Sequence, residues 1–235
     1  MTTENIKNLR LKSGLTQAEI SSLLGVSTRT IASWESGSVK TLSTYEAQSI
    51  TQLFLPVLLV KKLKEMTARA FDAVPCEMVS IWLVDNEECF TLPGTTKRAF
   101  GQSGDLPKTI CSLSKESLTT YPLRTGEKLN LAGDAIINHK TKNNKSNRAS
   151  HLFKDGICES LLHIPAFIPS PRGPQPILLL SLENKMAGID SVVIKAQPDA
   201  EKIFDDNDVA KAVELAEEFK NLILDDMKLL GMINV

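Results

Sequence analysis

The chain has 235 residues, of which 42% are hydrophobic and 23% are charged, and its formal net charge is -1. This length is comfortable for two domains, and the composition is that of a globular protein able to bury a core. The longest apolar run, residues 53–60, is interrupted by Pro56 and is far shorter than the roughly 18–20 residues of a membrane helix. The first residues lack the apolar core of a signal peptide, so we expect a cytoplasmic protein without a membrane partner.

Two short helices are expected first. One spans residues 5–11 and stops before Gly14, with apolar positions at Ile6, Leu9 and Leu11. The second follows Thr16, which has the spacing of a capping box with Glu19, and it ends at Gly25. The residues expected to be buried by this second helix are Ile20, Leu23 and Leu24.

A third short helix is expected from Ser27, a good capping residue, to about Glu35. At 3.6 residues per turn, one of its faces is small and polar and carries Thr28, Arg29, Ala32 and Ser33. Ile31 and Trp34 point the other way and can anchor the helix to its neighbours. Because arginine can contact guanine bidentately and serine or threonine can bond to any base, this division suits a helix that enters a DNA groove.

The run LRLKSGLTQAEISSLLGVSTRTIASWESG, residues 9–37, closely resembles the Cro/cI-type (XRE) helix-turn-helix of phage repressors. The resemblance covers about residues 6–40. It implies that Gln17 touches phosphate, that Lys40 contacts the DNA backbone, and that Arg10 pairs with Glu35 for structural reasons. The positions that match base-reading ones are Ser27, Thr28, Arg29 and Ser33. The alternative is a helix-turn-helix that serves only as a protein–protein module.

The charge of this segment predicts how many copies are needed. Residues 1–42 hold five basic and three acidic residues, a local charge of +2. Because phosphate contacts supply most non-specific affinity, so few cations imply weak binding by one copy. Helix-turn-helix dimers read half-sites about one DNA turn apart, so we expect the rest of the chain to supply a homodimer on double-stranded DNA.

After this segment, residues 41–55 can form a helix that Pro56 ends, or Pro56 can open the next helix. Residues 57–73 are strongly helical, and their apolar positions have alternating spacings of four and three residues, as in a coiled coil. These positions are Leu59, Leu63, Met66 and Ala70. A helix packed on its own domain is the equally weighted alternative.

From Glu77 the pattern changes to strands. The expected strands are residues 78–85, a hairpin partner beginning at 89–92, and the segments 129–135, 160–169 and 176–185, of which the last two pair. A long terminal helix capped by Asp205 or Asp206 follows. Its expected apolar side consists of Val209, Val213, Ala216, Ile223, Met227 and Leu230. The predicted fold class is α+β, with a small all-α helix-turn-helix domain followed by an antiparallel sheet flanked by helices.

This second part resembles a GAF domain, a small-molecule sensor domain, through the segments SIWLVD, LRTGEKLNLAGDA and ICESLLHIPAF. The predicted organisation is therefore residues 1–55 as the DNA-binding domain, 56–76 as a connecting helix and 77–235 as a GAF-like sensor and dimerisation domain. In cyclic-nucleotide-binding GAF domains the pattern N-K, spacer, F-x-x-x-D-E recurs. The matching residues here are Asn184, Lys185, Phe204 and Asp208, and Val209 replaces the glutamate.

The resemblance does not specify the ligand. Lys185 and Asp208 can pair and close one side of a pocket, or brace the fold. The polar loop of residues 138–150 can cover a pocket and attract an anion, or be a solvated loop. No cysteine is followed by histidine, so a covalent bilin is not expected.

The four cysteines are widely separated, and the three histidines have no metal-binding spacing, so a metal site is not expected. Conventional catalytic motifs are absent, and the chain is not expected to be an enzyme. The leading hypothesis is a dimeric DNA-binding transcriptional regulator that requires no cofactor and is modulated by an unknown small-molecule effector. Two alternatives remain: a GAF domain that only dimerises or docks a partner protein, or a redox sensor that uses Cys111 and Cys158, the pair of cysteines favoured by the sequence.

Overall fold

The computed structural model describes residues 3–39, 41–85, 87–98, 109–137, 139, 158–186 and 203–233. The chain forms two compact units. The helical unit consists of Met1–Lys62 and Leu222–Val235, and the sheet unit of Leu63–Asn221. Within the residues described, no helix combines the length and the apolar character needed to cross a membrane.

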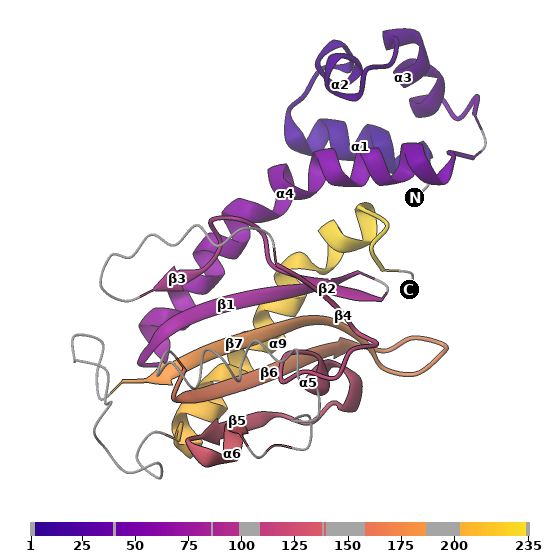
Figure 1. Ribbon diagram of the computed structural model, residues 1–235. Coiled ribbons are helices and arrows are strands. Elements are labelled where there is room, and N and C mark those ends of the chain that lie inside the picture. Colours follow the sequence, from indigo (N-terminus) through magenta and orange to yellow (C-terminus); the bar gives the residue numbers. More distant parts are fainter. Residues whose placement is uncertain are drawn as a thin grey trace. The chain divides into compact units, whose positions relative to one another are not determined.

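The helical unit begins with three short helices, α1 (Thr3–Ser13), α2 (Gln17–Leu24) and α3 (Thr28–Glu35) (Figure 1). The predicted capping box is present at the start of α2, where Thr16 and Glu19 each accept a backbone N–H from the other residue. Gly25 ends α2 in the left-handed conformation, with φ of 67°. The local signals in the sequence therefore set where these helices start and stop.

The buried side of these helices is narrower than predicted. Ile6, Leu9 and Ile20 are buried as expected, but Leu11 and Leu23 are each 59% exposed. At 3.6 residues per turn, Leu11 lies on nearly the opposite side of α1 from Ile6 and Leu9, so it faces away from the buried side. Leu23 lies beside Ile20 on α2 but at the edge of the buried side, where the neighbouring short helices do not cover it.

The helix α4 (Thr44–Ala73) runs without interruption through Pro56, contrary to the prediction that Pro56 ends one helix or opens another. An internal proline costs about 3 kcal/mol because it removes one hydrogen bond and crowds the preceding turn. Ile50 and Phe54 before it and Leu59 after it are fully buried. Burial of side chains on both sides outweighs the cost, and Pro56 itself is exposed.

Residues 222–235 also belong to the helical unit. Helix α9 (Asp206–Leu229) is shared between the two units: its residues up to Asn221 belong to the sheet unit, and those from Leu222 onward belong to the helical unit. The carboxylate of Asp226 is 1% exposed and is bound by Lys12 of α1 and, at 2.5 Å, by Lys62 of α4. The hydroxyl of Thr51 also donates to the carbonyl of Leu230 at 2.9 Å.

In the described ranges, the strands of the sheet unit form a seven-stranded sheet in which every strand pair is antiparallel. The main strand order is β4-β2-β1-β7-β6-β5, and β3 pairs with β1. The strands are β1 (Cys76–Asp85), β2 (Glu88–Phe90), β3 (Lys97–Arg98), β4 (Ile110–Ser112), β5 (Leu129–Ala132), β6 (Ser160–Ile168) and β7 (Gln175–Lys185). The α+β fold class is confirmed, as are the β1–β2 hairpin and the pairing of β6 with β7.

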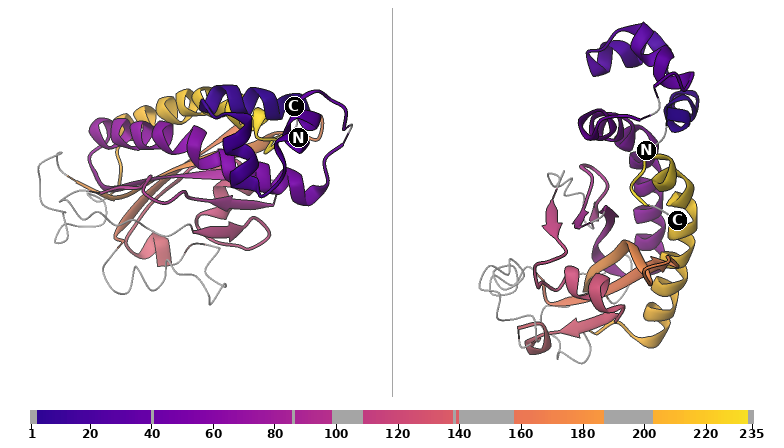
Figure 2. Two further views of the ribbon diagram at one scale, coloured as in Figure 1. Left: turned by 90° about the horizontal axis from the view of Figure 1, so that it is seen from above. Right: turned by 90° about the vertical axis from the view of Figure 1, so that its right-hand side faces the viewer.

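Helices cover both faces of this sheet. The part of α4 after Lys62 and the first turns of α9 lie side by side on one face (Figure 2), joined by a bidentate ion pair between Arg69 and Glu218 at 2.7 and 2.8 Å. The short helix α5 (Thr120–Thr125) packs on the other face, where Leu123 joins Val84, Cys89 and Leu179 in one apolar cluster. A still shorter helix, α6 (Asp134–Ile137), follows β5.

Several boundaries differ from the prediction. The strand expected at residues 129–135 ends at Ala132 because Asp134 starts α6. The helix expected over residues 57–73 does end at Ala73, but the strand expected from residue 78 begins earlier, at Cys76. The predicted domain limits 1–55, 56–76 and 77–235 stay a prediction, because the compact units are defined by packing and not by function.

The apolar positions proposed for a coiled coil are buried within the single chain. They are Leu59, Leu63, Met66 and Ala70, each at most 2% exposed. These side chains are therefore not available for a seam between two copies, and the alternative of a helix packed on its own chain holds. On the side predicted to be apolar, Ala216, Ile223 and Met227 of α9 are buried, as is Leu230, the residue after the helix. Val209 and Val213 are only partly buried.

Candidate functional sites

Helix α3 presents the small polar face that the sequence predicts. Ile31 and Trp34 are buried against the rest of the helical unit. On the opposite side Thr28, Arg29 and Ala32 are exposed, and Ser33 is partly buried. In the part of the chain that the structure describes, nothing pairs with the Arg29 guanidinium. Arg29 therefore offers an uncommitted cation with donors arranged for bidentate contact.

Ser27 and Thr28 are partly committed to the fold. The Ser27 hydroxyl caps α3 by accepting the Thr30 N–H at 3.1 Å, and it lies 2.8 Å from the Thr30 hydroxyl. The Thr28 hydroxyl donates to Ser21 at 3.4 Å, a long contact. Ser27 thus has a structural role in starting the helix, while the exposed Thr28 can exchange a weak internal contact for an external one.

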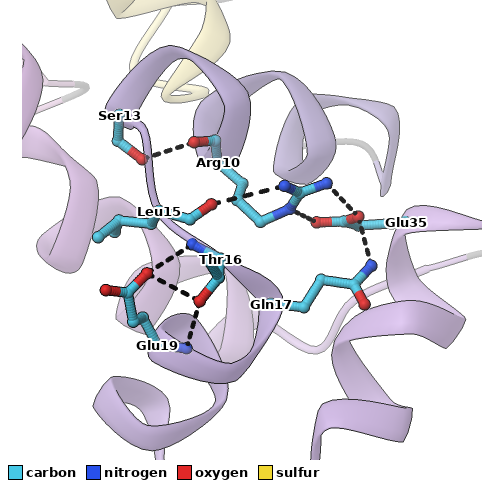
Figure 3. A network of polar contacts seen from close by, with 7 residues as sticks. All are labelled: Arg10, Ser13, Leu15, Thr16, Gln17, Glu19 and Glu35. Atoms are coloured by element: carbon cyan, nitrogen blue, oxygen red, sulfur yellow. Dashed lines mark hydrogen bonds and ion pairs between the residues drawn. The ribbon is translucent and has the colours of Figure 1, made fainter.

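Arg10 of α1, Gln17 of α2 and Glu35, the last residue of α3, form one hydrogen-bonded network (Figure 3). The Arg10 guanidinium donates to both carboxylate oxygens of Glu35, at 2.6 and 3.0 Å, so the pair implied by the resemblance is present. Gln17 donates to the same carboxylate at 2.8 Å. The hydrogen bond to Glu35 therefore fixes the Gln17 side chain, from which a phosphate contact is predicted.

The protonation of this network follows from its partners. Burial raises the pKa of Glu35, but the hydrogen bonds from Arg10 and Gln17 and the positive charge of Arg10 outweigh burial, so the pKa lies below its usual value. Glu35 is ionised at neutral pH. The remaining predicted DNA contact, Lys40, lies outside the described residues.

The four residues of the GAF motif lie in the sheet unit, where their ion pairs and hydrogen bonds hold separate segments of the chain together. Lys185, near the end of β7, binds the carboxylates of Asp205 and Asp208, each at 3.0 Å. Asp205 caps α9 by accepting the N–H groups of Asn207 and Asp208, and Asp208 accepts the Asp205 N–H in return. Asp208 is buried. This arrangement fixes the start of α9 to β7.

Asn184 and Phe204 have comparable structural roles. Asn184 adopts a left-handed backbone, with φ of 55°, and accepts the Glu159 N–H at 2.6 Å while donating to Glu77. Phe204 is buried, and its backbone exchanges two hydrogen bonds with the Asn130 amide, at 2.6 and 3.2 Å. The contacts of the four motif residues are all made within the sheet unit, so they support a structural role.

A row of polar side chains that the sequence reasoning missed crosses the centre of the sheet. Ser80 of β1 lies opposite Ser181 of β7, and Ser181 lies opposite His163 of β6. Partners in register point to the same face of a sheet, and all three residues are buried. Each is a polar residue within an otherwise apolar strand sequence. This interruption of the apolar pattern is visible in the sequence and could have been used to predict a buried polar site.

This row lies on the sheet face that carries α5. The His163 ring nitrogen Nδ1 lies 3.1 Å from the carbonyl of Leu118, which precedes α5. Burial lowers the pKa of His163 to about 4 against the opposing effect of that hydrogen bond, so the ring is neutral at physiological pH. A neutral imidazole can both donate and accept hydrogen bonds, and His163 lies opposite the hydroxyl of Ser181. The polar loop predicted at residues 138–150 lies outside the described residues except for His139.

The cysteine pair named from the sequence is wrong. Cys158 belongs to an apolar cluster with Leu118 and Leu129, whereas Cys111 packs against a separate cluster that contains Cys89. The strand register places Cys111 directly opposite Cys89. One sequence cannot show this pairing, because it depends on how β4 returns to β2. No group of three or more metal-ligating side chains occurs among the residues described.

Comparison with known proteins identifies the first domain. Residues 6–54 match the family model HTH_3, Helix-turn-helix. The matched region covers most of α1, all of α2 and α3, and the start of α4. The chain therefore carries a helix-turn-helix domain, a class of DNA-binding fold. A search of curated proteins finds no match.

Solved structures similar to the chain include GAF domains at low identity. One is a GAF domain/HD domain protein from Geobacter sulfurreducens, with 14% identity, a TM-score of 0.48, and coverage of 73% of this chain and 95% of that chain. Another is the GAF domain of an Acinetobacter phosphoenolpyruvate-protein phosphotransferase, with 16% identity, a TM-score of 0.39, and coverage of 82% and 100%. A third is the A. Aeolicus nlh2 GAF domain in an inactive state, with 12% identity, a TM-score of 0.38, and coverage of 95% and 98%.

Proposed function

We propose that this chain is a sequence-specific DNA-binding transcriptional regulator that acts as a homodimer and whose DNA affinity is modulated by a small molecule bound at the sheet unit. The observation that carries the DNA-binding part is the exposed guanidinium of Arg29 on the polar face of α3, which no residue in the described ranges pairs with, while Ile31 and Trp34 anchor the opposite face. Thr28 and Ser33 flank Arg29 and extend the readout, while Gln17 and Lys40 contact the DNA backbone.

The test of the DNA-reading role is to select an operator and then measure the affinity of variants for it. Arg29→Ala should cost about 1–3 kcal/mol and relax the preference at one base pair, because a bidentate contact to guanine is lost. Arg29→Lys keeps the positive charge but removes the paired N–H donors of the guanidinium, so the base preference should be lost as well. The matched control is Arg172→Ala, which removes an exposed arginine from the sheet unit.

Two outcomes separate the possible roles of Arg29. If Arg29→Lys keeps both affinity and base preference, Arg29 contacts phosphate and does not read a base. Unchanged affinity and preference in Arg29→Ala would remove Arg29 from the interface altogether. In that case the alternative, a helix-turn-helix that binds protein, becomes the better explanation of α3.

The dimer follows from the weak attraction of a single copy for DNA. With a local charge of only +2 in residues 1–42, one copy makes few phosphate contacts, whereas two linked copies add their binding energies. We expect a two-fold symmetric operator, with half-site centres about 10 base pairs apart or a multiple of this. Moving the half-sites by half a DNA turn should abolish tight binding, and an unchanged affinity would contradict the dimer.

The effector is expected at the sheet face that carries Ser80, Ser181 and His163. A buried row of neutral hydrogen-bonding groups suits an uncharged polar molecule or the uncharged part of a larger one. Compounds that raise the melting temperature of the wild type should fail to do so with Ser181→Leu, which fills this face. A bound compound must also change DNA affinity, since only differential affinity shifts an equilibrium.

The second candidate function keeps DNA binding and makes the sheet unit a ligand-free dimerisation or partner-docking domain. The ion pairs of Lys185 favour it, because the motif shared with cyclic-nucleotide-binding domains is occupied by internal contacts. If no compound changes both melting temperature and DNA affinity, while Ser181→Leu leaves the dimer intact, this second function is the correct one.

A further inference from the structure

Two cysteines face one another across the edge of the sheet. Cys89 of β2 and Cys111 of β4 are directly opposed in the antiparallel ladder. The backbone hydrogen bonds of this ladder lie two residues to each side, from Leu113 to Glu87 at 2.7 Å and from Thr91 to Thr109 at 3.0 Å. Because such bonds recur at every second residue pair, Cys89 and Cys111 also occupy a hydrogen-bonded pair, whose Cα atoms are about 5.5 Å apart.

This separation matches that of disulfide-bonded cysteines, whose Cα atoms are most often about 5.5–6 Å apart. Directly opposed side chains also point to the same face of a sheet, so both thiols lie on one side. The two thiols are hydrogen-bonded to one another. The Cβ atoms of a hydrogen-bonded pair are about 5.5 Å apart, whereas those of a disulfide are about 3.5–4.5 Å apart, so bond formation requires a local shift of about 1 Å that brings β4 toward β2.

The two thiols differ in their access to solvent. Cys89 is fully buried in the cluster formed by Val84, Leu123 and Leu179. Cys111 is only partly buried and lies on β4, which is at one end of the strand order in the described part of the sheet. A dissolved oxidant can reach Cys111 first, with Cys89 waiting behind it. An accessible thiol beside a second, resolving thiol is the arrangement typical of reversible cysteine oxidation.

We propose that Cys89 and Cys111 are a redox modification site, at which a peroxide converts the two thiols into an intramolecular disulfide. The Cys111 sulfur attacks one peroxide oxygen, the O–O bond breaks, and Cys111 becomes a sulfenic acid while one water leaves. The Cys89 sulfur then displaces the sulfenic hydroxyl, which leaves as a second water with the Cys89 proton. Two thiols are oxidised by two electrons, and one peroxide is reduced.

The order of these steps follows from the environment of Cys89. Its pKa is raised by the hydrogen bond with Cys111 and by burial, so Cys89 stays a protonated thiol at neutral pH. The thiolate is the attacking form of a cysteine, which leaves Cys111 as the first group to react. The product joins β2 to the edge strand β4. Its formation is independent of the proposed DNA and effector sites.

The experiment uses the full chain, reduced, freed of reductant and then treated with hydrogen peroxide under native conditions. After the peroxide is removed, the chain is unfolded at low pH in denaturant containing N-ethylmaleimide so that buried thiols are also blocked as the pH is raised, and the digest is mapped by mass spectrometry without reduction. We expect one linked peptide pair containing Cys89 and Cys111, loss of two of the four alkylatable thiols, and recovery of both with dithiothreitol. Cys111→Ser should abolish the linked pair, whereas the control Cys76→Ser should retain it.

Other products would overturn the proposal. These are a Cys111–Cys158 linkage, a disulfide between two copies, oxidation of Cys111 to sulfinic acid with Cys89 still alkylatable, and a Cys89–Cys111 linkage that forms only in urea. Circular dichroism checks that each variant is folded. If Cys111→Ser does not fold, the map of the wild-type chain alone decides, because it identifies the linked cysteines directly.

Discussion

Replacing Glu35 with glutamine tests the network that positions α3. The carboxylate accepts two hydrogen bonds from Arg10 and one from Gln17, and the side chains of Arg10 and Glu35 are only 17% and 6% exposed. Glutamine has nearly the same shape, but one carboxylate oxygen becomes an NH₂ group. At least one of the three donors then meets another donor, and the Arg10 charge loses its partner.

The expected loss is about 2–3 kcal/mol in the free energy of unfolding at pH 7. A hydrogen bond to a charged group contributes about 1.5–3 kcal/mol, and breaking a fully buried ion pair costs about 3–5 kcal/mol. The value lies toward the lower end because Arg10 retains some contact with solvent, which screens the charge. Such a loss is a large part of the stability of a small domain.

The effect should depend on pH in a defined direction. The pKa of Glu35 is lower in the folded state than its usual value of 4.5, so the folded chain binds fewer protons near that pH. The contribution of Glu35 is therefore fully present above about pH 4.5 and is lost as the pH falls through the folded pKa. The difference between wild type and Glu35→Gln should shrink correspondingly in acid.

The assay is urea unfolding followed by tryptophan fluorescence. The chain has two tryptophans, and Trp34 is buried in the helical unit, so a Trp82→Phe background makes Trp34 the reporter of that unit. A loss below about 0.5 kcal/mol at pH 7, the range of an exposed ion pair, would refute the reasoning about burial. A difference that is equally large at pH 3 and pH 7 would show that charge is not its cause.

Three further predictions concern stability. Thr16→Ala removes the side-chain acceptor of the α2 capping box and should cost about 1 kcal/mol in the Trp34 titration, with no loss contradicting the cap. Asp226→Asn leaves two lysines facing a neutral amide and should cost about 2 kcal/mol in the same titration, less than for a fully buried pair because both lysines reach solvent. His163 has a folded pKa of about 4 against 6.5 unfolded, so the unfolded chain binds the extra proton between these values. The sheet unit, followed by Trp82 in a Trp34→Phe background, should gain about 3 kcal/mol from pH 4 to pH 6.5, and His163→Gln should flatten this rise.

The helical unit was the easiest part to predict because its signals are local. Thr16 and Glu19 start α2 within one turn, Gly25 ends it, and the 3.6-residue period separates the buried Trp34 from the exposed Arg29. Each inference needs only residues that are neighbours in the chain. The polar face of α3 therefore followed from the sequence together with its anchors.

Features that depend on distant residues could not be predicted in the same way. Asp226 binds Lys12 and Lys62, which lie 214 and 164 positions away, and nothing in a single sequence links them. The Cys89–Cys111 register depends on the path of β4 back to β2. Continuity of α4 through Pro56 also required knowing that side chains on both sides are buried, since the local rule for proline indicates a break.

The return of the chain end to the helical unit has a consequence for genetics. Leu222–Val235 belongs to the same compact unit as the helix-turn-helix, and it carries Asp226 together with the buried Ile223 and Met227. A premature stop codon near position 222 would leave every predicted DNA contact encoded, yet it would remove part of the core that supports them. Mutations of the buried residues in Leu222–Val235 should therefore have effects similar to those of mutations in the core beneath α1–α3.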